Sequence, residues 1–416
     1  MKSDAQSQAA PKISFPELVA ITAAAMALNA LAIDMMLPAL GIIGDELGAA
    51  RDNDRQLIIV VYVLGNGVAQ LFFGPIVDRF GRRRVLLWSL GGYILGSFLS
   101  VVAGSFALLL AARAFQGVTT AATRVAIIAI VRDQTSGRRM AEVMSLAITI
   151  FMAAPILAPG FGQLILFAAP WRGIFVVLLL YGFVLLAWCA WRVPETLPKS
   201  ARKKLDLGHI GGSYFEFLRN RVAIGYTLVA ALVFGALFGY ISASEQIFVG
   251  TFKLGDRFPL AFALVAGALA CATLLNARLV GRLGMRRLTH SALLFLVVVN
   301  VVHLAIVSTV GESLVLFLLF TSLSFFALGL IGPNTSALAM EPMGHIAGAA
   351  AAANGFAGTT VAAFLGGVVG RFYDGTSTPI VMGFACLALA AFAVALWTEE
   401  GKLFQIGTEY EREETD

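Results

Sequence analysis

A short, strongly charged stretch, Gly74 to Arg84, stands between two long apolar runs. It holds one acid, Asp78, and four arginines, and it is too short to form a domain of its own. A bilayer core of roughly 30 Å is crossed by about 20 apolar residues, the length of the runs on either side. We therefore expect a turn at a membrane surface, where glycines permit close helix approach and the charges can pair across a moving interface. The pattern predicts a polytopic transporter.

The composition supports a membrane protein. Of the 416 residues, 59% are hydrophobic and only 13% are charged, which is about half the charge of a soluble domain. The mean hydropathy is +0.84. The cysteines Cys189, Cys271 and Cys386 lie in apolar segments without CxxC spacing, and the four histidines have no metal-ligand spacing. We expect neither a disulfide framework nor a metal site.

Twelve apolar segments are long enough to span a bilayer as helices, and they lack the alternation of membrane strands. They lie near 17–40, 56–76, 84–103, 106–131, 142–167, 171–192, 221–246, 258–280, 289–309, 313–338, 346–370 and 378–398. The predicted fold is an all-α membrane protein with twelve transmembrane helices. Its expected parts are an N-tail (1–16), a six-helix half (17–192), a linker (193–220), a second six-helix half (221–398) and a C-tail (399–416).

The distribution of basic residues predicts the orientation. With the N-terminus inside, 22 of the 30 lysines and arginines fall in inner segments and helix ends, and 6 fall outside. This asymmetry obeys the positive-inside rule and predicts that the tails and the linker are cytoplasmic. Residues 1–16 lack the apolar core and cleavage site of a signal peptide, so the first helix is expected to stay uncleaved. The net charge of +5 reflects topology and does not imply nucleic-acid binding.

The two halves of the chain repeat the charged turn. The stretch Asp78 to Arg84 aligns with Gly281 to Arg287, and Gly281 follows Asp78 by 203 residues. A repeated turn in two six-helix halves predicts pseudo-symmetry, with a substrate path between the halves.

Four motifs together resemble the major facilitator superfamily, specifically its twelve-helix drug:proton antiporter branch and the Bcr/CflA-type exporters. Gly74 to Leu86 matches the loop signature G-x-L-x-D-R-x-G-R-R-x-x-L, with Ile76 in place of Leu. Arg113, Gln116 and Gly117 match R-x-x-Q-G on the fourth helix. Residues 34–38 are similar to D-M-x-L-P, and 332–348 resemble the join of the tenth and eleventh helices.

The resemblance implies export of small amphipathic compounds, such as drugs and antibiotics, by proton antiport through alternating access. It also implies a bacterial cytoplasmic (inner) membrane as the location. The expected partners are a small-molecule substrate, protons and the lipid bilayer, and the expected state is a monomer. No nucleotide-binding G-x-x-x-x-G-K-[ST] stretch is present, so no cofactor is expected and the proton gradient is the energy source. The alternatives are a dedicated metabolite exporter or a proton symporter on the same fold, and, further away, a membrane receptor or enzyme.

Asp34 and two arginines are the candidates for proton coupling. Asp34 lies about 24 Å along the first predicted helix, a few ångströms inside the outer leaflet, where burial would favour proton uptake. It either binds the coupled proton, as the resemblance implies, or merely ends the helix. Arg113 and Arg124 are 11 residues apart and share a helix face within about 20°. The resemblance gives Arg113 a part in proton-linked exchange. The alternative for both is a structural contact with backbone carbonyls.

The antiporter signature of the fifth helix is only partly matched. The family pattern G-x8-G-x3-G-P-x2-G-G keeps Pro159 and Gly162, has Ser or Ala at three glycine positions and ends in Gln163. Pro155 lies on the same helix. Small residues remain at these sites, so close helix packing is expected to survive.

A polar stripe and several scattered residues are the candidates for the substrate cavity. Tyr62, Asn66 and Gln70 recur at i, i+4 and i+8 on the second helix. They either bind substrate or bond a neighbouring helix. The other cavity candidates are Gln116, Phe234, Phe238 and Asn354. For the aromatic residues, core packing or lipid contact is the alternative, and Glu245 is expected to be a solvated helix end.

The charged turn itself is the candidate cytoplasmic gate. Its members are Gly74, Asp78, Arg79, Gly81, Arg82 and Arg83. The resemblance makes Asp78 a latch to the other half, at the start of the eleventh helix near 344–347, where an acid suits the helix dipole. Because the second turn has Gly281 in place of the acid, only one turn can form this latch.

Overall fold

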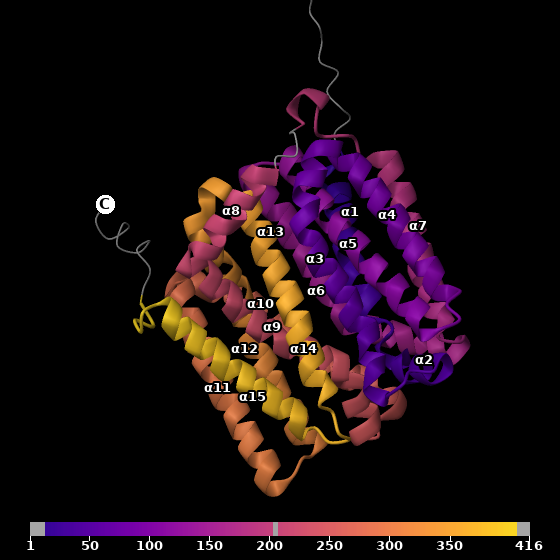
Figure 1. Ribbon diagram of the computed structural model, residues 1–416, viewed down its shortest axis with the longest axis vertical. Helices are drawn as coiled ribbons and strands as arrows, with labels where there is room; N and C mark the ends of the chain where they lie inside the picture. The colour runs from indigo at the N-terminus through magenta and orange to yellow at the C-terminus, as the bar shows by residue number, and fades with distance from the viewer. Residues whose placement is uncertain (1–12, 203–206, 406–416) are drawn as a thin grey trace, which may run out of the picture.

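The computed structural model describes residues 13–202 and 207–405, and these residues form helices and no strand (Figure 1). The first half comprises α1 (Phe15–Asp34), η1 (Leu37–Ala39), α2 (Leu40–Leu47), η2 (Asp52–Gln56), α3 (Leu57–Phe80), α4 (Arg82–Val101), α5 (Phe106–Gln134), α6 (Gly137–Ala168) and α7 (Arg172–Arg192). The connection holds η3 (Lys199–Ala201) and α8 (Leu207–Arg219). The second half comprises α9 (Arg221–Glu245), η4 (Gln246–Thr251), η5 (Gly255–Arg257), α10 (Phe258–Leu283), α11 (Met285–Val310), α12 (Leu314–Met340), η6 (Glu341–Ile346), α13 (Ala347–Phe356), η7 (Ala357–Val361), α14 (Ala362–Arg371) and α15 (Thr378–Thr398).

Eleven continuous helical runs in the described residues are long and apolar enough to cross a membrane. One of them, Leu314–Arg371, has 58 residues and would be about 87 Å long if straight, nearly three bilayer cores. It contains non-helical backbone at Met343 (φ −109°, ψ 19°), so α12 and the α13–α14 segment are separate crossings. The predicted twelve-helix fold is therefore confirmed.

The same helix pairs recur in the two halves. In the first half α5 packs against α3 and α4, α1 against α6, and α4 against α7. In the second half α12 packs against α10 and α11, α9 against α14, and α11 against α15. Equivalent elements thus make equivalent contacts, which is the pseudo-symmetry predicted from the repeated turn.

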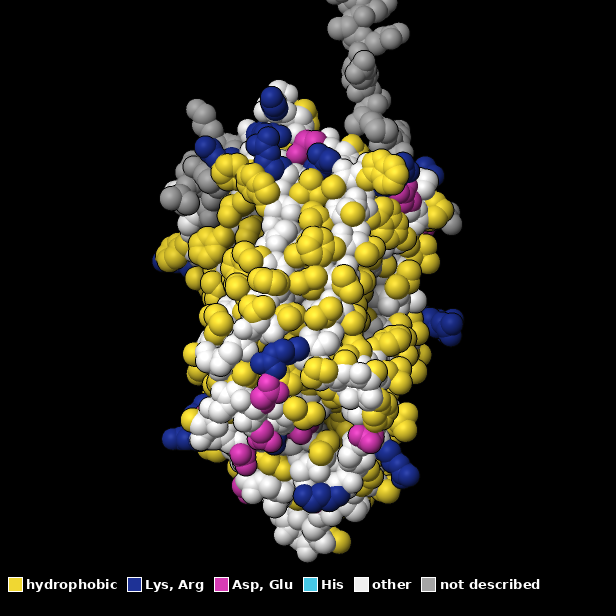
Figure 2. All heavy atoms as spheres, turned by 90° about the vertical axis from the view of Figure 1, so that its right-hand side faces the viewer, with side chains coloured by type: hydrophobic (Ala, Val, Ile, Leu, Met, Phe, Trp, Pro, Cys, Tyr) yellow, Lys and Arg dark blue, Asp and Glu magenta, His cyan; other side chains and the backbone are white. Residues whose placement is uncertain are grey.

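On the face shown in Figure 2, most charged side chains lie toward the two ends of the molecule, and apolar side chains form a broad band between them. We call the end that carries the α3–α4 turn and Lys199 the basic end. We call the other end, with η2, η4 and the α14–α15 turn, the opposite end. The apolar band between them is what a protein needs in contact with lipid chains.

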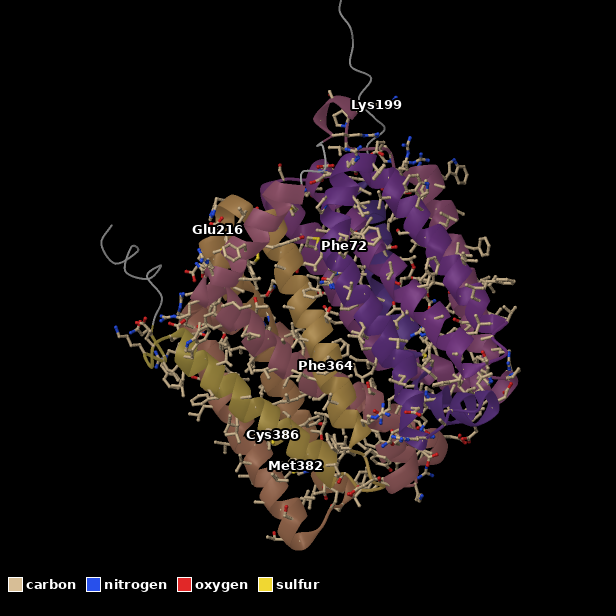
Figure 3. The ribbon with its side chains drawn as sticks, viewed as in Figure 1. Phe72, Lys199, Glu216, Phe364, Met382 and Cys386 are labelled. Carbon is tan, nitrogen blue, oxygen red and sulfur yellow. The ribbon has the colours of Figure 1, made fainter. Side chains whose placement is uncertain are left out.

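The connection between the halves contains a helix that the sequence analysis treated only as linker. On one side of α8, Phe217 is buried against Ala223, Met343 and Ala350. The hydroxyl of Tyr214 donates to the carbonyl oxygen of Leu71 on α3, at 2.7 Å. Glu216, at the same end as Lys199, bonds His345 at 2.6 Å (Figure 3). The α8 helix therefore touches both halves.

The repeated turns place a glycine at equivalent positions with left-handed backbone. Gly81 has φ +99° and ψ 143°, and Gly284 has φ +74° and ψ 153°. A side chain in this region is strained at either site. A Cβ on Gly81 would also lie 2.4 Å from the Glu195 carboxylate, whereas no atom lies within 4 Å of one on Gly284. Of these two glycines, only Gly81 has a neighbouring side chain in the space that a Cβ would fill.

We expect Gly81→Ala to lower the thermal unfolding midpoint of the purified protein more than Gly284→Ala does. Both substitutions add the same kind of backbone strain, about 1–3 kcal/mol, so their difference reports the contact with Glu195. Differential scanning fluorimetry in one detergent measures both midpoints. Equal losses in the two variants would contradict the tight packing of the first turn.

Candidate functional site

A fully buried guanidinium, that of Arg113 on α5, joins several helices of the first half. Its Nη2 donates to the carbonyl oxygen of Ala32 on α1 at 2.8 Å, and its Nε to that of Ile58 on α3 at 3.4 Å. Its Nη1 donates to Gln116 Oε1 at 2.5 Å. The guanidinium also lies over the ring of Tyr62, 4.4 Å from the centroid. Carbonyl dipoles and an aromatic face thus replace water around this cation.

Asp34 is the last residue of α1 and is only 3% exposed. Its carboxylate oxygen Oδ1 is buried without a hydrogen-bond partner. The carboxyl interacts electrostatically with Tyr62 of its own half and with Tyr240 of the other half. The Tyr240 hydroxyl is also buried without a partner. Asp34 therefore stands where the two halves meet.

The helical run continues past Asp34. After α1 ends, the chain passes through η1 and α2 to Leu47, so the run Phe15–Leu47 has 33 residues. Asp34 therefore lies within this run and not at its end.

The glycine of the antiporter signature lies against the residue that follows Asp34. A Cβ on Gly162 of α6 would lie 1.8 Å from the carbonyl oxygen of Met35. By contrast, Gly160 has no atom within 4 Å of such a Cβ. Pro155 and Pro159 lie inside α6, which stays continuous through both. The surviving glycine of the signature thus sets how closely α6 can approach the end of α1.

The polar stripe on α3 makes contacts between helices. The Tyr62 hydroxyl bonds Asn29 and Thr120, each at 3.0 Å. Asn66 donates to the carbonyl oxygen of Gly117 at 3.4 Å and accepts from Gln70 at 3.2 Å. Of the two alternatives left by the sequence, these contacts match the bonding of neighbouring helices.

Gln70 extends this stripe to the other half. Its amide donates to Thr359 Oγ1 in η7 at 3.3 Å. Close by, a Cβ on Gly67 would lie 2.3 Å from Thr360 Oγ1, and one on Gly355 would lie 2.2 Å from Gln70 Oε1. The π-helical turn η7, a geometry that often marks functional sites, therefore sits on the interface between the halves.

Gln116 and Arg124 differ from their predicted environments. Gln116 is fully buried and donates to Ser97 at 2.7 Å, so it supports Arg113 and does not line an open cavity in this conformation. The side chain of Arg124 on α5 is exposed in this conformation. An arginine within a membrane span needs such access to water or a charged partner.

The remaining cavity candidates lie in the second half and are half-buried. The ring of Phe234 lies near Gly332, and Phe238 packs against Gly366. Asn354 accepts from Thr227 at 2.8 Å and donates to Ser336 at 3.1 Å. Asn354 thus ties α13 to α9 and α12, while part of its side chain stays accessible.

The charged turn forms ion pairs and hydrogen bonds within its own half. Arg82 is buried, pairs with Asp133 and donates to the carbonyl oxygen of Ala129 at 3.0 Å. Arg83 donates to the carbonyl oxygen of Ala190 at 2.6 Å, and Arg79 lies over the ring of Phe80. Gly74 has open space around it.

The predicted latch of Asp78 is wrong for this conformation. Asp78 is paired with Arg82, one turn along the chain, at 3.8 Å. The start of α13, where the latch was expected, meets α8 through Met343 and His345. The linker helix occupies the surface that the acid was predicted to reach.

A polar network joins the two halves at the opposite end, and we did not predict it from the sequence. Gln56 bonds Gln246 and the carbonyl oxygen of Gly370. Asn53 donates to the carbonyl oxygens of Arg371 and Tyr373 at 3.0 and 2.9 Å. The one signal in the sequence was the pair Glu245-Gln246 within an otherwise apolar run.

Comparisons with known proteins identify the relatives of this chain. The family model of the Major Facilitator Superfamily matches residues 22–367. An uncharacterised MFS-type transporter, YdgK of Bacillus subtilis, is 31% identical over 330 residues, 78% of this chain and 81% of that protein. A bicyclomycin resistance protein homolog of Haemophilus influenzae is 29% identical over 381 residues, 87% and 91% of the two chains. The multidrug resistance protein MdtL of Klebsiella pneumoniae is 31% identical over 236 residues, 56% and 59%.

Solved structures share the fold at low sequence identity. The human organic anion transporter MFSD10 superposes with a TM-score of 0.70 at 20% identity and covers 92% of this chain and 100% of its own. A partially occluded inward-open structure of the xylose transporter XylE from Escherichia coli gives 0.71 at 12% identity, with 92% and 97% covered.

These matches confirm the resemblance that the motifs carried, and they place this chain among multi-pass membrane transporters that take small-molecule substrates and are not enzymes. The chain belongs to the Major Facilitator Superfamily.

Proposed function

We propose that this protein exports small amphipathic compounds in exchange for protons. The observation that carries the proposal is Asp34, a buried carboxyl with an unpartnered oxygen at the meeting of the two halves. An ionised carboxylate is costly in such a place, so a conformational cycle that alternately wets and buries it takes up and releases a proton. The relatives named for bicyclomycin resistance and multidrug resistance support drugs as the class of substrate.

The conformation supports alternating access. The Gln56–Gln246 and Asn53 contacts join the halves at the opposite end. Arg124 is exposed, and at the basic end no atom lies within 4 Å of a Cβ placed on Gly74. We assign the basic end to the cytoplasm from the excess of Lys and Arg there. The structure is then inward-facing, in the inner membrane of a bacterial host, with both termini in the cytoplasm.

The mechanism uses residues on both sides of the site. Arg113 holds the end of α1 in place. The proton on Asp34 favours one orientation of the transporter and the substrate favours the other, because each binds the two orientations with different affinity. The half-buried Phe234, Phe238 and Asn354 are the proposed substrate contacts, with Arg124 across the opening. A single chain is the proposed working unit. It needs no cofactor, and the proton gradient supplies the energy.

Two measurements test this function. A growth-inhibition panel that includes bicyclomycin and amphipathic cations, on cells that express the protein, selects a substrate. That compound is then followed in vesicles with an imposed pH gradient. Export is supported if the compound moves against its own gradient only when protons flow the other way. Accumulation that ignores the pH gradient overturns the proposal.

Asp34→Asn is expected to abolish proton-driven accumulation, by at least about tenfold, while the folded protein stays intact. The neutral amide cannot release a proton, and it is cheaper to bury than a carboxylate. Uptake in vesicles and the unfolding midpoint measure the two effects. Asp45→Asn, an exposed acid on α2, is the matched control and should keep coupled transport. Coupled transport in Asp34→Asn would exclude Asp34 as the proton site.

Gly162→Ala is expected to reduce coupled transport by more than about tenfold, because its Cβ would push the Met35 carbonyl and displace Asp34. Gly160→Ala adds the same methyl group to the same helix at a position with open space. Transport rates normalised to the amount of inserted protein compare the two variants. Equal rates would show that the α1–α6 contact does not position the site.

A further inference from the structure

An ion pair joins the two halves beside the polar network of the opposite end. Arg55 of η2 and Glu245, the last residue of α9, lie with Nε and Oε2 3.5 Å apart. Their side chains are only 19% and 9% exposed. From the sequence we expected Glu245 to be a solvated helix end, and the structure instead places it in the interface.

The pair fills a space that a glycine leaves open. A Cβ on Gly41 of α2 would lie 2.9 Å from Arg55 Nη1 and 3.0 Å from Glu245 Oε1. Neither Arg55 Nε nor Glu245 Oε2 has a hydrogen-bond partner. The attraction of opposite charges is therefore the main compensation for burying them.

Neighbouring contacts depend on the same alignment of the halves. Gln56 follows Arg55 in the sequence, Gln246 follows Glu245, and these two glutamines bond each other. Gln246 also donates to Asn53 at 2.7 Å and its carbonyl oxygen accepts from Tyr373 at 2.8 Å. These are neutral hydrogen bonds, so a pH-dependent contribution here comes from the ion pairs. The Arg55–Glu245 pair is the more buried one, with side chains 19% and 9% exposed, whereas Arg371 of the Asp54–Arg371 pair is 54% exposed.

A surface cavity reaches the arginine of the pair. The cavity, of about 290 Å³, is lined by Gly44, Asp45, Gly48, Ala49, Arg51, Asp52 and Arg55. Arg55 forms part of its wall and is paired with Glu245, whose side chain is 9% exposed. Only the Arg55 side chain therefore stands between the cavity and the Glu245 carboxylate.

We propose that Glu245 is a second proton-binding residue, which unlocks the outer gate when the external medium is acidic. A proton on Glu245 removes the charge that compensates Arg55 and leaves a cation unpaired in the closed interface. Opening hydrates Arg55, so protonation of Glu245 shifts the equilibrium toward the outward-open state. When the proton leaves, the pair reforms and the gate closes. The assignment of this end as external rests on the proposed function.

Other charged groups lie near this pair, and the experiment must control for them. Asp45 of α2 interacts electrostatically with Glu245. Asp54 is paired with Arg371 of α14 at 3.5 Å, while Arg51 and Asp52 line the cavity. Asp45→Asn and Asp54→Asn are therefore the controls for the neighbouring acids.

The experiment measures the width of the outer gate in the purified full chain without substrate. Spin labels are placed at Ala50→Cys and Thr376→Cys, two exposed positions on opposite sides of the gate. Cys271→Ser and Cys386→Ser remove the exposed natural thiols. Distances are recorded by double electron–electron resonance from pH 8 to pH 5. The open-to-closed ratio is expected to rise at least about tenfold on acidification.

Variants of the pair give the expected signature. Glu245→Gln should be largely open and insensitive to pH, because Arg55 is unpaired throughout. The double variant Arg55→Gln/Glu245→Gln removes both charges and should close again without pH dependence. Asp45→Asn and Asp54→Asn should still respond to pH, because the Arg55–Glu245 pair remains. Asp45→Asn, which removes a negative charge near Glu245, should need a lower pH to open.

The results separate this proposal from proton antiport at Asp34. A pH response that survives Glu245→Gln overturns the gate proposal. A response that disappears in Asp34→Asn while persisting in Glu245→Gln assigns the sensor to Asp34 and leaves antiport standing. Loss of coupled transport in Asp34→Asn together with an unchanged gate response in that variant supports two separate proton sites.

Discussion

The buried guanidinium of Arg113 is the constraint on which the site depends. A cation in an apolar interior needs dipoles in place of water, and the end of a helix offers carbonyl oxygens that the helix itself does not use. Arg113 donates a hydrogen bond to the carbonyl oxygen of Ala32, two residues before α1 ends. The negative end of the α1 dipole favours the same contact. This contact therefore holds the end of α1, and with it Asp34, against α5.

The halves meet through apolar and polar contacts. One apolar cluster contains buried residues of both halves, such as Leu37 and Tyr240, and beside it lie close glycine contacts at Gly67 and Gly355 and amide bonds such as Gln70–Thr359. Water can replace an amide bond at a net cost of only about 1 kcal/mol. Flat glycine surfaces can slide without changing rotamers. The halves can thus move as rigid bodies while their cores stay packed.

The sequence predicted whatever depends on local pattern. Apolar length identified the spans, and motif spacing identified Arg113, Asp34 and Gly162. It could not show what depends on three-dimensional partners: that Arg113 bonds Ala32, that Gln116 is buried behind it, or that Asp78 pairs with Arg82. The helix α8 was missed because it is short and not apolar enough to read as a span. Glu245 was misjudged because its partner, Arg55, lies 190 positions away.

If both proposals hold, the surroundings of the two carboxyls impose an order on protonation. The polar network around Gln56 and Gln246 joins the halves at the opposite end, and the surface cavity beside it is lined by Arg55, the partner of Glu245. In the proposed cycle an external proton would therefore meet Glu245 first. Protonation there would weaken the closed interface, and the opening that follows would expose Asp34 to the same medium. Glu245 would then control access from outside, whereas Asp34 would carry the proton that is exchanged for substrate.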